Sequence, residues 1–400
     1  MRMPRLRFRA DDGSEFPDWE ERTSVELCSR MIGGGTPSTS NTGNYNGDIS
    51  WISSSDLDVD NITTVRRTRF ITEGAVATSA TKKVKPGSIA VVLRVGVGKV
   101  ALLDRETCTS QDFISLEGVT GDTKFIAYML SARMQREAVR TQGTSIKGIP
   151  ATRFKELTYR MPPSIIEQRK IADLLSTVDD VIVVQQAEVD AWEQRKKGVM
   201  QKLFSQEVRF KADDGSDFPD WEEKTLGDVG TVAMCKRVFK EQTSAVGDVP
   251  FFKIGTFGGT PDAYISRSLF NELKSKYPYP KVGTILLSAS GTIGRQVVYS
   301  GEDAYYQDSN IVWLEHDDTV LDSYLRQFYA VVKWQGLEGS TIKRLYNKTI
   351  LDTPFCHPSL PEQRKIANCL SSLDDVIVKA KAELTKWQEL KKGLLQQIFV

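Results

Sequence analysis

The chain contains a long internal repeat, which limits its possible folds more than any other feature. The segment Phe8–Glu21 returns almost unchanged as Phe210–Glu223, shifted by 202 residues. A second block, Glu167–Ser176, returns as Glu362–Ser371, shifted by 195 residues. Repeats this long exceed the period of solenoid proteins, which is about 20–50 residues. The 400-residue sequence therefore predicts two related domains.

The segments between the two blocks are related more distantly, and they align without gaps at a shift of 196 residues. The matching pairs are Gly87/Gly283, Ile89/Ile285, Gly98/Gly294, Gln111/Gln307, Asp112/Asp308, Gly143/Gly339, Ile146/Ile342 and Lys147/Lys343, with Lys99 opposite Arg295. Most other positions differ. The sequence thus predicts one fold that is used twice with two different surfaces.

The repeat is also circular. The first unit continues past Phe204 into Phe210, whereas the sequence stops at Val400, just after Phe399, the residue equivalent to Phe204. The N-terminal segment up to Glu21 supplies the connector that the second unit lacks at its end. We therefore expect the two ends to meet and the units to be related by a pseudo-twofold axis.

Each repeat is predicted to end in a long helix of roughly 60 Å, at 1.5 Å per residue. Capping boxes at Ser164-x-x-Glu167 and Ser359-x-x-Glu362 follow prolines and indicate the helix starts. Apolar residues then alternate at steps of three and four, forming a seam of Ile171, Leu175, Val178, Ile182, Val189 and Trp192, repeated as Ile366, Leu370, Leu373, Ile377, Leu384 and Trp387. The polar residues Gln185, Lys196 and Lys391 interrupt the seam and could fix its register.

An antiparallel coiled coil of the two helices fits the circular repeat best. The alternative, a helical hairpin within one core, fits poorly because a whole mixed domain separates the helices. The fold class is therefore α+β, with two similar mixed α/β domains joined by the helix pair. The expected divisions are a connector at 1–22, a domain at 23–160, a helix at 161–207, a second connector at 208–223, a second domain at 224–357 and a final helix at 358–400.

The overall charge is balanced, with 53 Lys and Arg against 52 Asp and Glu. This excludes a polycationic tail but not a local basic groove. No apolar run reaches the length of a membrane span and no signal-peptide core is present, so we expect a cytoplasmic protein without membrane contact. The five cysteines and two histidines lack disulfide or zinc spacing, and no metal site is expected.

Catalytic motifs are missing from the sequence. Arg94–Lys99 resembles part of a phosphate-binding loop but lacks its full spacing, and Asp352–Phe355 only approaches the aromatic tetrapeptide of amino-methyltransferases. We therefore expect neither catalytic residues nor a cofactor in this chain. A self-sufficient DNA methyltransferase is an alternative, and the missing motifs argue against it.

Binding chemistry is better represented. Residues identical in both copies cannot by themselves give two domains different preferences, so Gln111, Gln307, Lys147 and Lys343 are assigned to phosphate or scaffold contacts. The cations Lys99, Arg295, Lys236 and Arg237 are assigned to the same group because they could neutralise phosphates. Base-reading candidates lie where the copies diverge, at Ser53, Ser54, Ser55, Asp56, Lys82, Lys83, Arg94, Ser288, Ser290, Thr292, Arg344 and Tyr346. Each charge cluster taken alone is also explained by a solvated surface.

The layout resembles the specificity subunit of type I restriction–modification systems. Both helices open with Glu-Gln-Arg-Lys-Ile-Ala after prolines, and Gly34-Gly-Thr-Pro-Ser38 followed by Asp48-Ile-Ser-Trp-Ile52 is similar to the opening of the family's target-recognition domains. Gly143-Thr-Ser-Ile and Gly339-Ser-Thr-Ile fit the domain ending. The second domain departs from the pattern, because Lys236–Lys240 replaces the Gly-Gly-Thr-Pro-Ser opening. The two half-sites are then expected to differ.

The resemblance implies a DNA-binding subunit without catalysis of its own. Each target-recognition domain would read one half of a split, asymmetric site in double-stranded DNA, and the helices would set the spacer. Two methyltransferase subunits, using S-adenosylmethionine, would dock on the helices, and two ATP- and magnesium-dependent restriction subunits would complete the enzyme. A coiled-coil scaffold with two protein-binding domains and no DNA role is the alternative. The recognised sequence, the spacer length and the presence of restriction subunits do not follow from the residues.

Overall fold

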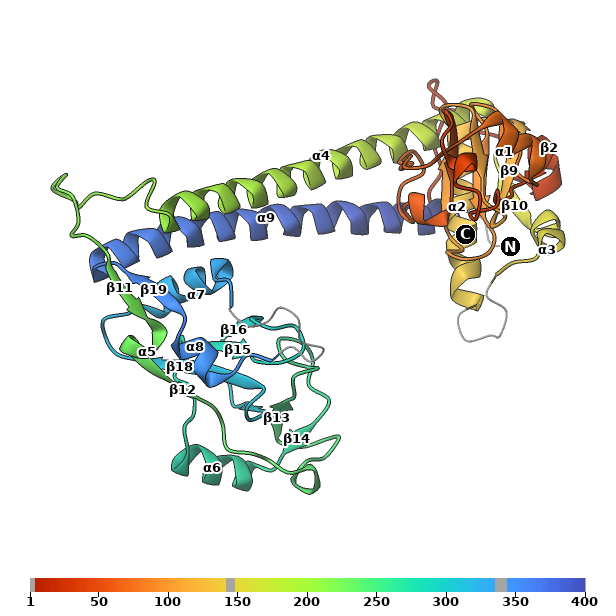
Figure 1. The fold of residues 1–400 in the computed structure, drawn as a ribbon. Coiled ribbons are helices and arrows are strands. Elements are labelled where there is room, and N and C mark those ends of the chain that lie inside the picture. The colour runs from red at the N-terminus through yellow and green to blue at the C-terminus, as the bar shows by residue number, and fades with distance from the viewer. Residues whose placement is uncertain (1–3, 142–147, 335–343, 400) are drawn as a thin grey trace. The chain divides into compact units, whose positions relative to one another are not determined.

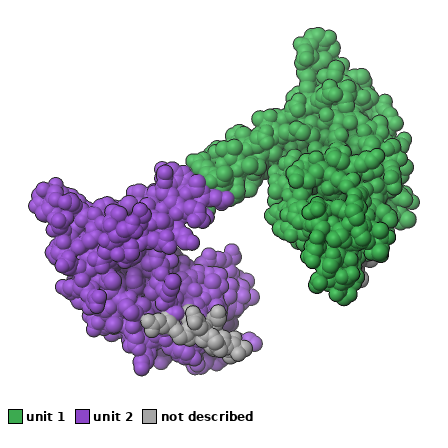
Figure 2. All heavy atoms as spheres, turned by 45° about the horizontal axis from the view of Figure 1, so that its top comes forward, with its two compact units in different colours: residues 1–188, 381–400 green, residues 189–380 purple. Residues whose placement is uncertain are grey.

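The computed structural model describes residues 4–141, 148–334 and 344–399. The chain forms two compact units (Figure 2): unit 1 comprises residues 1–188 and 381–400, and unit 2 comprises residues 189–380. Each unit contains one mixed α/β domain, the first half of one long helix and the second half of the other. The expected fold class of two mixed domains and two long helices is therefore confirmed.

Unit 1 contains two four-stranded sheets and a strand pair. In the first sheet the order is β2 (Cys28–Gly33), β9 (Phe113–Val119), β6 (Ile89–Val92) and β7 (Val100–Leu102), all antiparallel. In the second the order is β4 (Phe70–Ile71), β3 (Ile49–Ile52), β8 (Thr107–Thr109) and β5 (Lys83–Val84), with β3 and β8 parallel. β1 (Glu20–Thr23) pairs with β10 (Thr158–Met161), and the helices are α1 (Glu73–Thr78), α2 (Thr123–Thr141) and α3 (Ala151–Glu156).

Unit 2 repeats this topology. Its first sheet has the order β12 (Gly230–Ala233), β18 (Ile311–His316), β15 (Ile285–Ser288) and β16 (Gln296–Val298). Its second has the order β14 (Tyr264–Ile265), β13 (Val249–Phe252) and β17 (Tyr305–Tyr306), again with one parallel pair. β11 (Glu222–Thr225) pairs with β19 (Pro354–His357), and the helices are α5 (Leu226–Val229), α6 (Arg267–Lys276), α7 (Asp322–Val331) and α8 (Asn347–Leu351).

The same order of strands in both units explains why the middle segments align without gaps. Buried β-branched and aliphatic residues fill the central strands, as in Ile89–Val92 and Ile285–Ser288, where every residue is buried. Among the described residues, unit 2 has no counterpart of the edge strand β5. The shared fold is therefore fixed by the core strands, whereas the sheet edges differ.

The long helices are α4 (Ile165–Phe204) and α9 (Leu360–Ile398), which pack together (Figure 1). The start of α4 shares the unit 1 core with the end of α9, and the end of α4 shares the unit 2 core with the start of α9. The helices are therefore antiparallel within each unit, as expected. The seam residues Ile171, Leu175, Val178, Val189, Ile366, Leu370, Ile377 and Leu384 are buried, and Ile182, Trp192, Leu373 and Trp387 are half-buried.

Two of the polar residues that interrupt the seam form ion pairs between the helices. In unit 1, Lys391 Nζ of α9 lies 2.5 Å from Asp179 Oδ1 of α4, and both side chains are buried. In unit 2, Lys196 Nζ of α4 lies 2.6 Å from Asp374 Oδ1 of α9. Lys196 and Asp179 are the repeat equivalents of Lys391 and Asp374. The same ion pair is thus made twice with the two helices exchanged.

The first turn of each long helix contains a buried glutamate that the repeated connector binds. Both carboxylate oxygens of Glu167 accept hydrogen bonds from Arg7, Nε to Oε1 and Nη2 to Oε2, each 3.1 Å. Trp19 Nε1 also donates to Oε1, at 3.1 Å. The glutamate side chain is fully buried. The interpretation of Glu167 as the second half of a capping box is therefore wrong, because this carboxylate binds an arginine and a tryptophan instead.

Unit 2 contains the same arrangement. Arg209 donates to both oxygens of Glu362 at 3.1 and 2.8 Å, Trp221 Nε1 donates to Oε2 at 2.9 Å, and the hydrogen bonds to Glu362 raise the pKa of Arg209. Lys365 Nζ, one turn along α9, lies 2.6 Å from Asp213 in the same connector. We refer to Arg209, Trp221 and Glu362, and to their counterparts in unit 1, as the connector clamp.

The two ends of the described chain meet in unit 1, as the circular repeat predicts. Leu6 N donates to Gln397 O at 3.3 Å, and Arg5 N donates to the same oxygen at 2.8 Å. In unit 2 the equivalent hydrogen bond runs from Val208 N to Lys202 O at 3.2 Å, within continuous chain. The same hydrogen bond is thus made within continuous chain in unit 2 and between the two ends of the chain in unit 1.

Removing the arginine of a connector clamp should destabilise the protein strongly. Arg209→Ala leaves the buried Glu362 carboxylate without its counter-ion, and we expect a loss of about 3–5 kcal/mol in the free energy of unfolding of unit 2. Lys211→Ala, in an exposed ion pair of the same connector, should cost no more than about 1 kcal/mol. Urea titrations of both variants compare the losses, and equal losses would contradict the role given to the clamp.

Stability should also depend on the pH through His316, at the end of β18. Its Nε2 lies 3.1 Å from Asp322 Oδ1, and this hydrogen bond raises the pKa of His316 above 6.5, partly offset by burial. A histidine with a raised folded pKa contributes stability that is full below the unfolded pKa and is lost as the pH rises through the folded pKa. We expect His316→Gln to lose more stability at pH 6 than at pH 8. Urea midpoints across this range measure the difference, and a pH-independent difference would disprove the linkage.

Candidate functional site

Unit 1 has a cleft of about 670 Å³ at the end of β6, where Arg94 follows the buried strand. It is lined by Gly33, Gly34, Leu93, Arg94, Val95, Gln111, Asp112, Phe113, Ile114, Gly148, Ile149, Pro150 and Ala151. Arg94 is exposed, and the described residues offer it no hydrogen-bond or ion-pair partner. Gln111 accepts a hydrogen bond from Thr36 of the Gly-Gly-Thr-Pro-Ser segment. The cleft therefore brings together Arg94 and Gln111 from the candidate set.

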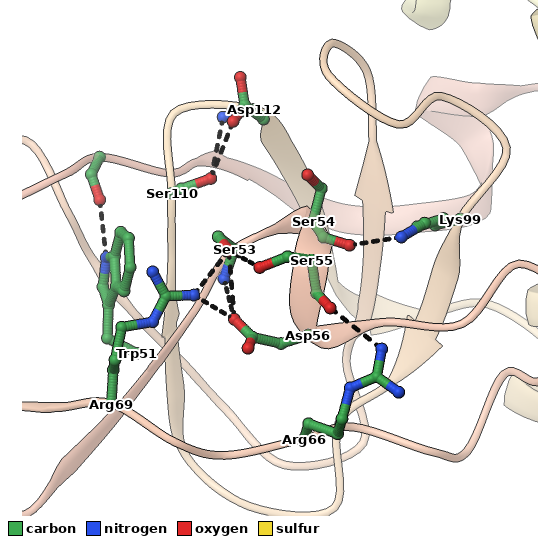
Figure 3. Close-up of polar contacts among 11 residues, drawn as sticks. Trp51, Ser53, Ser54, Ser55, Asp56, Arg66, Arg69, Lys99, Ser110 and Asp112 are labelled. Atoms are coloured by element: carbon green, nitrogen blue, oxygen red, sulfur yellow. Dashed lines mark hydrogen bonds and ion pairs between the residues drawn. The ribbon is translucent and has the colours of Figure 1, made fainter. Parts of the chain in front are cut away.

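The Ser53–Asp56 candidates form a tight turn beside Lys99 (Figure 3). Ser54–Asp56 is one turn of 3-10 helix, in which the Asp56 carboxylate accepts from Ser53 N at 2.8 Å. Arg69 forms an ion pair with Asp56 and donates to Ser53 Oγ at 2.6 Å. Its guanidinium lies 4.6 Å from the ring centroid of Trp51. Asp56 is thus occupied within the turn, and Ser55 is the exposed member of the four.

Lys99 donates to the carbonyl of Ser54 at 2.8 Å, which ties the turn to the strand β7 (Figure 3). Arg66 donates to the carbonyl of Ser55 at 3.0 Å. Both cations thus stabilise the turn through its backbone carbonyls. Arg69 belongs to the basic cluster Arg66-Arg67-x-Arg69, which by its sequence could neutralise phosphates. In the structure Arg69 pairs with Asp56 instead.

The two adjacent lysines differ in their surroundings. Lys83 Nζ lies 2.6 Å from Glu73 and 3.2 Å from Glu106, and its hydrogen bonds to these carboxylates raise its pKa. Lys82 is exposed, and no partner of it is found among the described residues. Only Lys82 of this pair has an uncompensated charge.

In unit 2 the turn from Ser288 to Arg295 corresponds, at the repeat shift of 196 residues, to residues 92–99 of unit 1. Ser288 is buried, and its Oγ donates to Thr292 O and accepts from Arg295 N at 2.9 Å. Arg295 Nη1 donates to Phe257 O at 2.9 Å, as Lys99 donates to a carbonyl in unit 1. Thr292 is exposed at the tip. Arg295 and Lys99 therefore have the same supporting role, and Ser288 has its hydroxyl inside the turn.

Ser290, Arg344 and Tyr346 lie together. Ser290 and Arg344 form an isolated antiparallel bridge, and Ser290 Oγ lies 2.9 Å from Asn310 Oδ1. Arg344 Nη2 donates to Ser309 O at 2.9 Å, and its guanidinium lies 6.0 Å from the ring of the exposed Tyr346. Ser309 has a left-handed backbone, with φ of 53°. Non-glycine residues held in this region cluster at functional sites.

Arg237 lines a groove of unit 2 with a volume of about 590 Å³, and Lys236 precedes it in the sequence. Arg237 Nε donates to Asp308 Oδ2 at 2.9 Å, and Lys236 Nζ lies 5.0 Å from the ring centroid of Tyr277. Gln307 also lines the groove, and its Oε1 accepts from Ile254 N at 2.9 Å. The exposed Phe239 on the same wall was not among the candidates, although its setting between Arg237 and Lys240 is a sequence signal for nucleic-acid contact.

Two candidates, Lys147 and Lys343, lie outside the described residues. Within the described ranges, no group of three or more His, Cys, Asp or Glu residues could hold a metal ion, and no helix is long and apolar enough to cross a membrane. Burial raises the pKa of Cys108 to about 11 and that of Cys235 to about 12, so both remain protonated thiols at neutral pH. The polar chemistry of both units therefore consists of hydrogen-bond donors and acceptors around clefts.

Comparison with known proteins identifies the family. A family model described as type I restriction modification DNA specificity domain matches the chain twice, at residues 17–189 and 219–386. The two matches cover most of the chain and correspond to the two halves of the repeat.

Curated relatives bear the same description. A protein from Haemophilus influenzae named as a type I restriction enzyme specificity subunit is 56% identical over 150 residues, which is 37% of this chain and 39% of that protein. The MjaIX specificity subunit of Methanocaldococcus jannaschii is 27% identical over 267 residues, 62% of this chain and 60% of that protein. The chain thus spans less than two thirds of the length of either relative.

Solved structures share the fold. The S subunit of a type I restriction–modification system from M. genitalium gives a TM-score of 0.56 at 18% identity, covering 100% of this chain and 99% of that chain. A chain from a structure concerned with complex assembly of the type I system gives a TM-score of 0.57 at 16% identity, covering 96% and 97%. With its doubled fold and two matches to the family model, the chain belongs to the family of type I restriction–modification DNA specificity subunits, the non-catalytic component that carries two target-recognition domains.

Proposed function

We propose that this chain gives a type I restriction–modification complex its DNA specificity, each unit reading one half of a split, asymmetric site in double-stranded DNA. One observation carries the proposal. The two units have the same strand order, but the residues that line their clefts differ. One scaffold with two different surfaces is what recognition of two unlike half-sites requires.

The antiparallel helices fix the spacer and dock the partners in this proposal. Two methyltransferase subunits bind S-adenosylmethionine and methylate adenine, and two ATP- and magnesium-dependent restriction subunits complete the nuclease. This complex acts in the cytoplasm. The balanced charge of the chain is compatible with this division, because the partners share the contact with DNA.

Target-recognition domains at 23–160 and 224–357 would carry the contacts, connected by segments at 1–22 and 208–223 and by helices at 161–207 and 358–400. We assign base reading first to candidates that are exposed or keep free donors, namely Ser55, Lys82, Arg94, Thr292, Arg344 and Tyr346. Ser53, Ser54, Asp56, Lys83, Ser288 and Ser290 would shape the reading surface. Lys99, Gln111, Arg295 and Gln307 would act as scaffold, and Lys236 and Arg237 would contact phosphates.

A coiled-coil scaffold without a DNA role is the competing function. Binding of the chain with its methyltransferase partner to DNA separates the two, because phosphate contacts make affinity fall steeply with salt. Mapping of methyladenine in DNA from cells that carry the complete system would then reveal a bipartite motif. If the complex does not bind DNA and no bipartite motif is found, the scaffold is the better explanation.

Replacing Arg94 should relax one half-site only. Arg94→Ala removes the uncompensated guanidinium of the unit 1 cleft, and we expect discrimination at one base pair to fall by about tenfold or more. Methylation of site libraries by the variant with its partner measures this, and Arg105→Ala provides a control at another exposed arginine of unit 1. Unchanged selectivity of the Arg94 variant would remove Arg94 from the reading surface.

A further inference from the structure

The two units place residues 94 and 290 at equivalent points, facing residues 148 and 344. In unit 1, Ile149 N donates to Leu93 O at 2.6 Å. In unit 2, Leu345 N donates to Ala289 O at 2.8 Å. Leu93 and Ala289 directly precede residues 94 and 290, and Ile149 and Leu345 directly follow residues 148 and 344. The repeat shift of 196 residues therefore relates the pair 94/148 to the pair 290/344 in space as well as in sequence.

The residues at this place are exchanged between the units. Unit 1 has Arg94 facing Gly148, whereas unit 2 has Ser290 facing Arg344. A Cβ atom on Gly148 would lie 3.1 Å from Arg94 Cα and 3.3 Å from Arg94 Cγ, so the glycine leaves room for the arginine. Each unit thus has one arginine here, but the two side chains come from opposite segments of the facing pair.

Both guanidinium groups keep free donors. Arg94 is exposed and has no hydrogen-bond or ion-pair partner among the described residues. Arg344 has one hydrogen bond, to the Ser309 carbonyl, and no carboxylate partner in the described chain. In contrast, other arginines of the two units have carboxylate partners: Arg69 pairs with Asp56, and Arg237 pairs with Asp308. Arg94 and Arg344 are therefore available to donate paired hydrogen bonds to a ligand.

The setting favours a base edge over a phosphate as that ligand. A phosphate contact needs only positive charge, which lysine also supplies, whereas a planar guanidinium matches the paired acceptors O6 and N7 of guanine. The cations at matching repeat positions, Lys99 and Arg295, are bound to backbone carbonyls. Of the two arginines that come from opposite segments, Arg94 has no partner among the described residues, and Arg344 keeps donors beyond its one hydrogen bond to Ser309 O.

We infer that each target-recognition domain reads one guanine-containing base pair of its half-site with a single arginine at this place, Arg94 in unit 1 and Arg344 in unit 2. This inference rests on the proposed DNA-reading function and names the residue that performs the same task in both units. It also predicts that the arginine of unit 2 can be moved to the facing position, where unit 1 has it.

The test uses the full chain with its methyltransferase partner and libraries of methylation sites. Arg344→Ala and Arg344→Gly should reduce discrimination at one guanine position of one half-site by about tenfold or more, with the other half-site unchanged. Arg344→Lys should also lose this discrimination, because lysine lacks the paired donors. The double variant Ser290→Arg with Arg344→Gly should restore a guanine preference in that half-site. Arg326→Ala, at an exposed arginine on α7, should leave selectivity unchanged.

Several outcomes would overturn the inference. A uniform fall in methylation over all sequences, with selectivity kept, would make Arg344 a phosphate contact. Unchanged selectivity of the Arg344→Ala and Arg344→Gly variants would exclude a reading role. Failure of a folded double variant to restore a guanine preference would show that the facing positions are not equivalent. Thermal unfolding of each variant verifies the fold. If the wild-type complex itself produces no bipartite motif, the proposed function fails, which is a separate result.

Discussion

The buried carboxylates of Glu167 and Glu362 are the interaction on which the rest of this architecture depends. Each is fully buried at the start of a long helix, and each is paired with one arginine and one tryptophan of the repeated connector. A buried carboxylate without its counter-ion is strongly unfavourable. The connector must therefore return to the helix start in both units, which fixes where the domain and the helix join.

The two long helices are also held together by ion pairs along their seam. Asp179 with Lys391 and Lys196 with Asp374 are one ion pair made twice with the helices exchanged. In unit 1 the buried Lys391 also donates to the carbonyl of Asp60, and Tyr128 of α2 donates to Asp179 at 2.6 Å. A shift of one helix against the other would separate these charges in a buried setting, so the pairs specify the register that an apolar seam alone leaves open.

Which side chains are available to read DNA depends on which polar groups already have hydrogen-bond or ion-pair partners within the protein. Ser53, Asp56, Lys83 and Ser288 have residue types that suit base recognition, but their hydrogen bonds hold turns and ion pairs together. Arg94 and Arg344 look no different from these residues in a sequence. Partners that come from distant positions, such as Arg69 for Asp56 and Ser309 for Arg344, decide which donors remain free. Local pattern cannot supply these partners, because they meet only when the sheets have formed.

The sequence by itself determined the duplication, the two mixed domains, the long helices with their apolar seam and the meeting of the two ends, because these follow from repeated blocks and hydrophobic periodicity. Only the tertiary structure decided that Glu167 and Glu362 bind the connector, that Lys99 and Arg295 support turns, and that one arginine occupies the same place from opposite segments. Those outcomes depend on long-range pairing of buried charges and donors, which residue spacing along one chain does not encode.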